Sequence, residues 1–392
     1  MNKHTGNFRL QIVDEVRAFA ADSLVGIELI QALNGVHPIE IKNALVSAGE
    51  EPLLERAFGE LNISGPVLKE ILRDDNPVLS FWPFTSSCAR QISDIVSEYE
   101  TVALLGVPTV FGVLKERLMR RAHTILFDTD DYLFRGKTTE GYIQCDVLSA
   151  APSQYENQFD VVLGDPPWYL EEYCSWLRTA VGLARPGGRV IFVLFPPNIR
   201  DTSKIERNEI LTIARQLLLD VEFLPSGALY ETPSFEQIEL IRNGISPIDW
   251  RTAQFFVGRV PLNKGRLVPS GKSESSNNWI ERRIGCGRIF VRAEPADIAT
   301  FLEPADGKSR FLSSPSRRDR GRNRSNVISS RGHGLCCSDP RLLVDLLGRV
   351  HEAVDIENIG GGLDRESGLL LEAVAADLWP RFISVQPKDE LV

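Results

Sequence analysis

The sequence lacks the long apolar runs that mark membrane and secreted proteins. No uninterrupted run approaches the roughly 20 residues that a membrane-spanning helix needs, and the first residues, MNKHTGNFRLQIVDEV, lack a signal-peptide core. We therefore expect no membrane partner and a cytoplasmic location. At 392 residues the chain is too long for one compact core, so two or three domains are expected.

Cysteines are few and scattered. The chain has 6, with no CxxC pair, so free thiols in a reducing compartment are expected rather than a disulfide framework. One stretch, HGLCC, places His333 close to Cys336 and Cys337. Adjacent cysteines are poor joint ligands for a tetrahedral ion, and no second ligand pair lies nearby, so we expect no metal.

An excess of positive charge is also absent. The net charge is −9, whereas a protein that coats nucleic acid must supply cations to neutralise phosphates. A local basic face stays open, because an arginine-rich stretch could either track the phosphates of RNA or DNA or form a solvated linker. Its members are Arg310, Arg317, Arg318, Arg320, Arg322, Arg324 and Arg331.

Three of the four regions that we distinguish flank the centre of the chain. Residues 1–76 carry short helical stretches between Gly, Pro and Asn, typical of a winged-helix or helix-turn-helix module, or of a docking domain. Residues 263–338 are rich in Ser, Gly and Arg and predict a partly flexible segment. Residues 339–392 return to helical periodicity. The terminal helical regions could also carry contacts of a homo-oligomer or with a protein partner.

Residues 77–262 alternate apolar β-branched runs with helical stretches. This alternation predicts an α/β fold, in which a mostly parallel, Rossmann-like sheet is covered by helices on both faces. The last two runs have little helix between them, so we expect an antiparallel hairpin at the sheet edge. The runs are TVALLG, HTILFD, YIQCD, FDVVLGD, GRVIFVLF, LDVEFLP and AQFFVGRV.

The first four predicted strands end in Gly106, Asp128, Asp146 and Asp165. Ligands of a parallel α/β sheet bind beyond these strand ends. A glycine there lets a ligand approach the backbone, and acids can accept hydrogen bonds from ribose hydroxyls and an adenine amine. Neither GxxxxGK[ST] nor GxGxxG is present to cradle a pyrophosphate. The pattern predicts a nucleoside ligand, S-adenosylmethionine or its decarboxylated relative.

The stretch Asp165-Pro166-Pro167-Trp168 suits recognition of an amine. Asp165 can accept a hydrogen bond from it, and the proline carbonyls are acceptors with no N–H beside them. Trp168 offers a flat face on which a base can stack. Simpler alternatives are a helix N-cap for Asp128, a turn residue for Asp146 and, for the whole fold, a binding module that has lost activity.

Two further stretches follow the fifth and sixth strands. LFPPNIRDTS, which contains Asn198, predicts either a loop over the acceptor or a simple strand terminator. YETPSFEQIEL places Tyr230, Phe235 and Gln237 where they could line the acceptor site or pack in the core.

DPPW at 165–168 resembles the [DNS]-P-P-[YFW] motif of amino-group methyltransferases of class I. LLGVPTVFGVL and ILFDTDDYLF are similar to the first two motifs of the N6-adenine-methyltransferase-like group, and the resemblance covers about residues 80–260. It implies transfer of a methyl group from S-adenosyl-L-methionine to an amino nitrogen, with adenine N6 in RNA or DNA favoured and protein lysine also within the group. By carry-over, the donor would be bound by Gly106, Pro108, Thr109, Asp128 and Asp146, and the acceptor amine by Asp165, Pro166, Pro167 and Trp168.

A second resemblance is to the aminopropyltransferases that build branched polyamines. They too place a helical, winged-helix-like domain before such a fold. Their first motif is acid-rich and GDDD-like, whereas this chain has GVPT. This resemblance implies decarboxylated S-adenosylmethionine as donor and a polyamine as acceptor.

Overall fold

The structure, a computed structural model, forms two compact units. The first contains residues 1–59, 83–231 and 249–274, and the second contains residues 60–82, 232–248 and 275–392. The residues that the structure describes are 3–62, 69–70, 75–79, 81–117, 123–130, 140–149, 153–263, 279–285, 287–312, 319–350, 359, 361–378 and 382–383.

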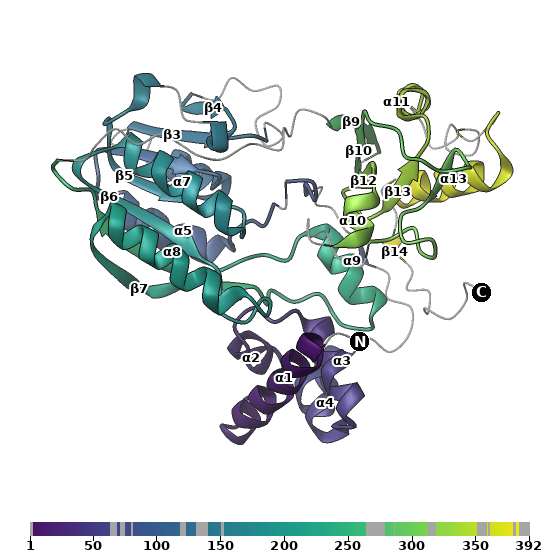
Figure 1. The fold of residues 1–392 in the computed structure, drawn as a ribbon, viewed down its shortest axis with the longest axis horizontal. Coiled ribbons are helices and arrows are strands. Elements are labelled where there is room, and N and C mark those ends of the chain that lie inside the picture. Colours follow the sequence, from purple (N-terminus) through teal and green to yellow (C-terminus); the bar gives the residue numbers. More distant parts are fainter. Residues whose placement is uncertain are drawn as a thin grey trace. The chain divides into compact units, whose positions relative to one another are not determined.

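A seven-stranded sheet of order β4-β3-β2-β5-β6-β8-β7 forms the centre of the first unit (Figure 1). The pairs from β4 to β6 are parallel, whereas β8 is antiparallel to both of its neighbours. Each strand corresponds to one of the seven apolar runs, so the predicted Rossmann-like α/β sheet is confirmed. The strands are β2 (Thr101–Leu105), β3 (His123–Asp128), β4 (Tyr142–Gln144), β5 (Phe159–Gly164), β6 (Ala184–Leu194), β7 (Leu219–Leu229) and β8 (Thr252–Arg259).

Helices cover the sheet in pairs. Helices α5 (Ser86–Val96) and α6 (Pro108–Arg117) pack together. Helix α7 (Leu170–Leu183) packs against α8 (Ser203–Leu217), β5 and β6 (Figure 1). Every residue of β5 is buried, as a central parallel strand requires. The apolar core therefore lies against the central strands and fixes the position of their carboxyl ends.

The antiparallel pairing of β7 with β8 at the sheet edge agrees with the predicted hairpin. The connection, however, is not a tight turn. It contains α9 (Ser234–Arg242), which belongs to the second unit. The sequence SFEQIELIR after Pro233 has the helical period that a short loop would lack.

Residues 3–62 contain four helices, a short 3-10 turn η1 (Gly59–Leu61) and an isolated bridge at Asn62. They show no β-wing, so within this range the helical prediction is confirmed without its winged-helix form. Val16, Leu29 and Phe58 are among the buried residues between these helices. The helices are α1 (Lys3–Ala21), α2 (Gly26–Ala32), α3 (Pro38–Ala48) and α4 (Glu51–Phe58).

The prediction that residues 1–76 are helical is wrong at residues 69–70, which lie in the helically periodic stretch SGPVLKEILRD. These two residues form strand β1 (Lys69–Glu70), which pairs with β14 (Phe382–Ile383). A backbone partner far along the chain thus overrides the local period, and the rest of that stretch lies outside the described residues.

A five-stranded antiparallel sheet of order β11-β13-β12-β10-β9 forms the centre of the second unit. Where they are described, residues 279–337 therefore form strands and a short helix, whereas their composition predicts a partly flexible segment. The four-part division at 76, 262 and 338 stays a prediction. The elements are β9 (Trp279–Ile284), β10 (Gly287–Arg292), β11 (Leu302–Pro304), α10 (Arg320–Arg324), β12 (Val327–Ser329), β13 (Gly334–Cys337), α11 (Pro340–Leu347) and α13 (Arg365–Leu378).

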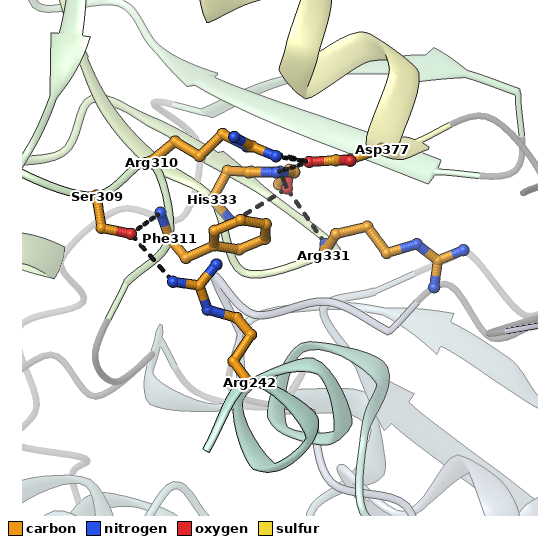
Figure 2. Close-up of polar contacts among 8 residues, drawn as sticks. Arg242, Ser309, Arg310, Phe311, Arg331, His333 and Asp377 are labelled. Carbon is orange, nitrogen blue, oxygen red and sulfur yellow. Dashed lines mark hydrogen bonds and ion pairs between the residues drawn. The ribbon is translucent and has the colours of Figure 1, made fainter. Parts of the chain in front are cut away.

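The turn between β12 and β13 carries a polar network around the buried His333 (Figure 2). His333 is 1% exposed, with Nδ1 2.6 Å from Ser329 Oγ and Nε2 3.1 Å from Asp377 Oδ2. Arg310 donates to the same Asp377 oxygen, and the Phe311 ring lies over the imidazole with centroids 4.5 Å apart. Burial lowers the pKa of His333. Both ring nitrogens are thus engaged by protein partners.

The arginine-rich stretch is not a continuous solvated arm. Arg322 and Arg331 are only 4% and 3% exposed, and Arg310 pairs with Asp377. Arg320 and Arg324 are exposed. The remaining two, Arg317 and Arg318, lie outside the described residues.

Two kinds of feature are absent from the described part of the chain. It contains no helix that is long and apolar enough to cross a membrane. Nor do three or more His, Cys, Asp or Glu side chains gather there into a group that could hold a metal ion.

Candidate active site

The carboxyl ends of β2, β3 and β5 meet at one edge of the sheet. Leu105 pairs with Phe127 on one side and with Gly164 on the other. The pairing continues past the strand ends, because Gly106 N donates to Phe127 O at 3.0 Å and Asp165 N donates to Leu105 O at 3.2 Å. The order of the strands reverses here, since β2 lies between β3 and β5, which is where α/β sheets bind ligands.

Gly106 lies at the turn from β2 into α6 with φ of +64°. A Cβ at this position would lie 2.7 Å from Trp176 Cη2 of α7. Conformation and packing therefore both demand glycine here, and Trp176 fills the space on that side of the residue. Gly106 itself is only half-buried. Pro108 and Thr109, the other donor-binding candidates of this turn, open α6.

Asp128 and Asp146 each make a local hydrogen bond. Asp128 Oδ1 accepts from Asp130 N at 3.0 Å, and Asp146 Oδ1 accepts from Leu148 N at 2.9 Å, at the start of the 3-10 turn η3 (Val147–Ser149). Burial raises the pKa of Asp128 to about 7. Asp146 thus takes the turn role given above as its alternative, whereas Asp128 makes a local turn contact and is followed by no helix within the described residues that it could cap. A carboxyl group accepts several hydrogen bonds, so these contacts leave capacity for a ligand hydroxyl or amine.

Asp165 is held by Tyr230, which follows β7. The Tyr230 hydroxyl lies 3.0 Å from Oδ1 and 2.9 Å from Oδ2 of Asp165. Tyr230 is buried, and its ring packs on Phe84 with centroids 4.9 Å apart. Burial raises the pKa of Asp165 to about 7, although the hydrogen bond from Tyr230 and the charge of Arg251 act to lower it. Asp165 is therefore both fixed in position and close to its titration point at neutral pH.

The two prolines after Asp165 differ in what their carbonyls do. The Pro167 carbonyl accepts a hydrogen bond from Tyr169 N at 2.7 Å. The expectation that both carbonyls would be free is therefore wrong for Pro167, because the chain turns back on it to start α7. In the described part of the chain no hydrogen bond reaches the Pro166 carbonyl, which leaves this carbonyl and Asp165 as neighbouring acceptors.

Trp168 is clamped by two arginines. The Arg251 guanidinium lies 3.9 Å from the indole centroid, and Arg200 Nη2 donates to the Trp168 carbonyl at 2.8 Å. The rings of Phe195 and Tyr230 lie 6.0 Å and 5.8 Å away. Arg251 covers one face of the indole, so Trp168 forms a wall of the site, and a base stacking on that face would have to displace Arg251.

Of the three residues predicted to line the acceptor site or pack in the core, Tyr230, Phe235 and Gln237, only Tyr230 contacts Asp165. Phe235 and Gln237 lie on α9 in the second unit, where Gln237 Nε2 donates to Thr232 O. Arg200 and Arg251 were missed, because each stands in a loop with no motif around it. The Pro-Pro pair before Arg200 was the one available signal.

A family model gives a direct match to this part of the chain. Residues 80–219 match the model described as "Probable N6-adenine methyltransferase". The match begins before α5 and ends at β7, so it contains DPPW and the ends of β2 to β5. The resemblance to the N6-adenine-methyltransferase-like group is thereby confirmed for residues 80–219, which are less than half of the chain. No curated protein matches the sequence.

Several solved structures resemble the chain at low identity. The branched-chain polyamine synthase from Thermus thermophilus, solved with N4-aminopropylspermidine and 5′-methylthioadenosine, is 11% identical over 69% of this chain and 97% of its own, with a TM-score of 0.45. The 16S rRNA N2 methyltransferase from T. thermophilus, in complex with AdoMet and guanosine, is 18% identical over 56% of this chain and 49% of its own, with a TM-score of 0.30. The Mtq2–Trm112 complex from E. cuniculi is 14% identical over 46% of this chain and 98% of its own, with a TM-score of 0.30.

The family match and the sheet point in the same direction. The strand order is Rossmann-like, and DPPW stands at the ligand edge, directly after the central strand β5. Together they support an S-adenosylmethionine-dependent methyltransferase domain over residues 80–219.

Proposed function

We propose that this protein transfers a methyl group from S-adenosylmethionine to an amino nitrogen, and that adenine N6 in RNA or DNA is the acceptor. One observation carries the proposal. The carboxyl group of Asp165 is fixed by the Tyr230 hydroxyl beside the Pro166 carbonyl, at the carboxyl end of the central strand β5. The family match over residues 80–219 supports the same chemistry.

The residues around β2, β3 and β4 fit the donor in type and place. Gly106 is half-buried where β2 ends, and Asp128 and Asp146 offer carboxyl oxygens at the ends of β3 and β4. Ribose hydroxyls and an adenine amine are the groups that such acids accept from. Pro108 and Thr109, in the first turn of α6, complete the donor side. The bound donor supplies an electrophilic methyl group on its sulfur.

The chain's own contribution is to place the amine and receive its proton. Asp165 and the Pro166 carbonyl can accept the two N–H bonds of one amine and so point its lone pair at the methyl group. Such positioning is worth several kcal/mol of barrier. As the new N–C bond forms and the S–C bond breaks, one N–H proton must leave. Asp165, whose pKa is about 7, can accept it.

The protonation state of the acceptor favours a nucleobase. The exocyclic amine of adenine is neutral at pH 7, whereas a lysine or polyamine amine has a pKa near 10 and must first lose a proton. The guanidinium of Arg251, which acts on Asp165, also opposes binding of a cationic amine. Protein lysine is therefore the second choice for the same methyl transfer.

Calorimetry with S-adenosylmethionine and with its decarboxylated form tests the donor. We expect binding of S-adenosylmethionine, weakened by Asp128→Ala. Clear binding of the decarboxylated form alone would replace this proposal with aminopropyl transfer to a polyamine. Binding of neither would leave a non-enzymatic binding module.

Asp165→Ala tests the acceptor side. We expect turnover of adenine-containing oligonucleotides to fall by about 100-fold or more, since the amine loses one of its two acceptors, while the affinity for S-adenosylmethionine stays the same. Methylation of nucleic acid and of protein fractions with labelled donor identifies the acceptor. Undiminished turnover in Asp165→Ala would contradict the catalytic assignment.

A further inference from the structure

Two segments of the first unit hold Trp168. The first is the β6 loop, residues 195–200, whose Arg200 donates to the Trp168 carbonyl. The second is the pre-β8 segment, residues 249–251, whose Arg251 covers the Trp168 ring. The pre-β8 segment also accepts a hydrogen bond from Tyr230 N at Arg251 O, at 3.0 Å. Both segments thus determine where the wall of the acceptor site stands.

The N-terminal helices contact the β6 loop at two points. Glu15 of α1 accepts a hydrogen bond from Asn198 Nδ2 at 2.9 Å, and its other oxygen is held by Gln11 Nε2 at 2.8 Å. Asn198 is only 7% exposed, so this contact is largely shielded from water. Between α2 and α3, Gly35 lies so close to the loop that a Cβ there would be 2.3 Å from Pro196 Cγ.

The same helices contact the pre-β8 segment. Gln31 of α2 donates from Nε2 to Asp249 O at 2.7 Å. The ring of His37, the N-cap residue of α3, meets the buried Trp250 ring edge-on with centroids 4.9 Å apart. Arg251 follows directly in the chain. Movement of α2 and α3 would therefore be transmitted to the guanidinium over Trp168.

We propose that helices α1 to α3 are a positioning element of the acceptor site. These helices hold both the β6 loop and the pre-β8 segment in position. Through Arg200 and Arg251 they determine the position of Trp168. The position of Trp168 in turn determines the shape that an acceptor must fit. The element determines acceptor specificity and has no part in holding the donor. The inference rests on the proposed function for the identity of the acceptor. The coupling of the N-terminal helices to Trp168 does not depend on that function.

A matched pair of glycine substitutions tests this coupling. Gly35 and Gly49 both have positive φ, +93° and +69°, and both lie at turns of the N-terminal helices. A Cβ at Gly35 meets Pro196 and Ile199, whereas a Cβ at Gly49 has nothing within 4 Å. Gly35→Ala therefore adds backbone strain and a wedge against the β6 loop, and Gly49→Ala adds the strain alone.

We expect Gly35→Ala to lower kcat/KM for the acceptor by about tenfold or more, because a displacement of about 1 Å is enough for such a loss. Binding of S-adenosylmethionine should stay within about twofold of the parent by calorimetry. Gly49→Ala should leave kcat/KM unchanged. Equal losses in both variants, or a loss of donor binding in Gly35→Ala, would overturn the inference.

Hydrogen exchange gives a readout that does not depend on turnover. Gly35→Ala, and separately Asn198→Ala, should speed amide exchange in peptides that cover residues 165–170 and 195–200, while Gly49→Ala should not. If no form of the protein methylates an acceptor, the proposed function fails, but the hydrogen-exchange measurement still tests the coupling. Unchanged exchange at residues 165–170 in both test variants would refute the coupling itself.

Discussion

At the scale of single residues, two opposing effects meet on Asp165. Burial raises its pKa to about 7, and the Tyr230 hydrogen bond and the Arg251 charge act in the other direction. A carboxyl group that titrates near neutrality can act as an acceptor and as a base. The same balance makes Asp165 sensitive to its neighbours.

Tyr230→Phe should shift the pH dependence of turnover to higher pH. The Tyr230 hydroxyl stabilises the ionised form of Asp165, so its removal raises the pKa of that carboxyl. A pH–rate profile between pH 6 and 9 measures the shift. Tyr155→Phe is the control, since Tyr155 contacts Phe127 and Phe159 through its ring. If the pH–rate profile of Tyr230→Phe is not shifted, Tyr230 does not set the pKa of Asp165.

Asp165→Asn should stabilise the fold at high pH. A carboxyl group with a raised pKa in the folded state favours folding below its unfolded pKa, and this contribution is lost as the pH rises through about 7. The neutral amide avoids that loss, which is on the order of a few kcal/mol at pH 8. Chemical denaturation of both forms at pH 5 and pH 8 gives the difference. A gain that is no larger at pH 8 than at pH 5 would contradict burial of an ionised Asp165.

At the scale of elements, the turn from β2 into α6 leaves no room for a side chain at Gly106. Gly106→Ala meets both an unfavourable φ of +64° and the Trp176 ring. We expect it to lower the free energy of unfolding by about 1–3 kcal/mol and to weaken binding of S-adenosylmethionine.

Gly112→Ala on α6 is the matched control for that turn. Gly112 lies within the helix, and a Cβ there has nothing within 4 Å. Alanine stabilises a helix interior relative to glycine by about 0.5–1 kcal/mol. Thermal unfolding and calorimetry of both variants separate the turn from the helix, and equal effects would argue against a special role for Gly106.

The elements of the first sheet could be predicted because each strand is a continuous apolar run. DPPW could be placed at the ligand edge for the same reason, since a motif that directly follows a strand inherits its position. Tyr230 could be named as a candidate near the acceptor site, but its hydrogen bond to Asp165 could not be derived, because the two residues are 65 positions apart in the chain. The strands of the second sheet are short and interrupted by arginines, as in WIERRI and GRIFVR, so composition hid them.

At the scale of the whole molecule, two separate apolar cores predict two unfolding transitions. One core surrounds residues such as Phe127 and Phe192, and the other surrounds residues such as Val291 and Leu371. Asp377→Ala leaves the buried His333 and the Arg310 guanidinium without their carboxylate, as Figure 2 makes clear.

Asp377→Ala should therefore lower only the transition of the second unit, by about 1–3 kcal/mol. S-adenosylmethionine should raise the other transition, because a ligand stabilises the unit that binds it. Differential scanning calorimetry with and without the donor assigns the two. A single transition that moves in both experiments would show that the units unfold as one.

The order of the last three strands, β6-β8-β7, has a consequence for synthesis on the ribosome. Strand β8 lies between its two partners, yet residues 252–259 emerge after both of them and after the whole of residues 232–248. Until then β6 and the nascent β7 expose unpaired edges, which are the surfaces on which nascent chains aggregate. A ribosome stalled before residue 252 therefore carries an incomplete sheet, and chaperone capture should fall sharply once β8 leaves the exit tunnel.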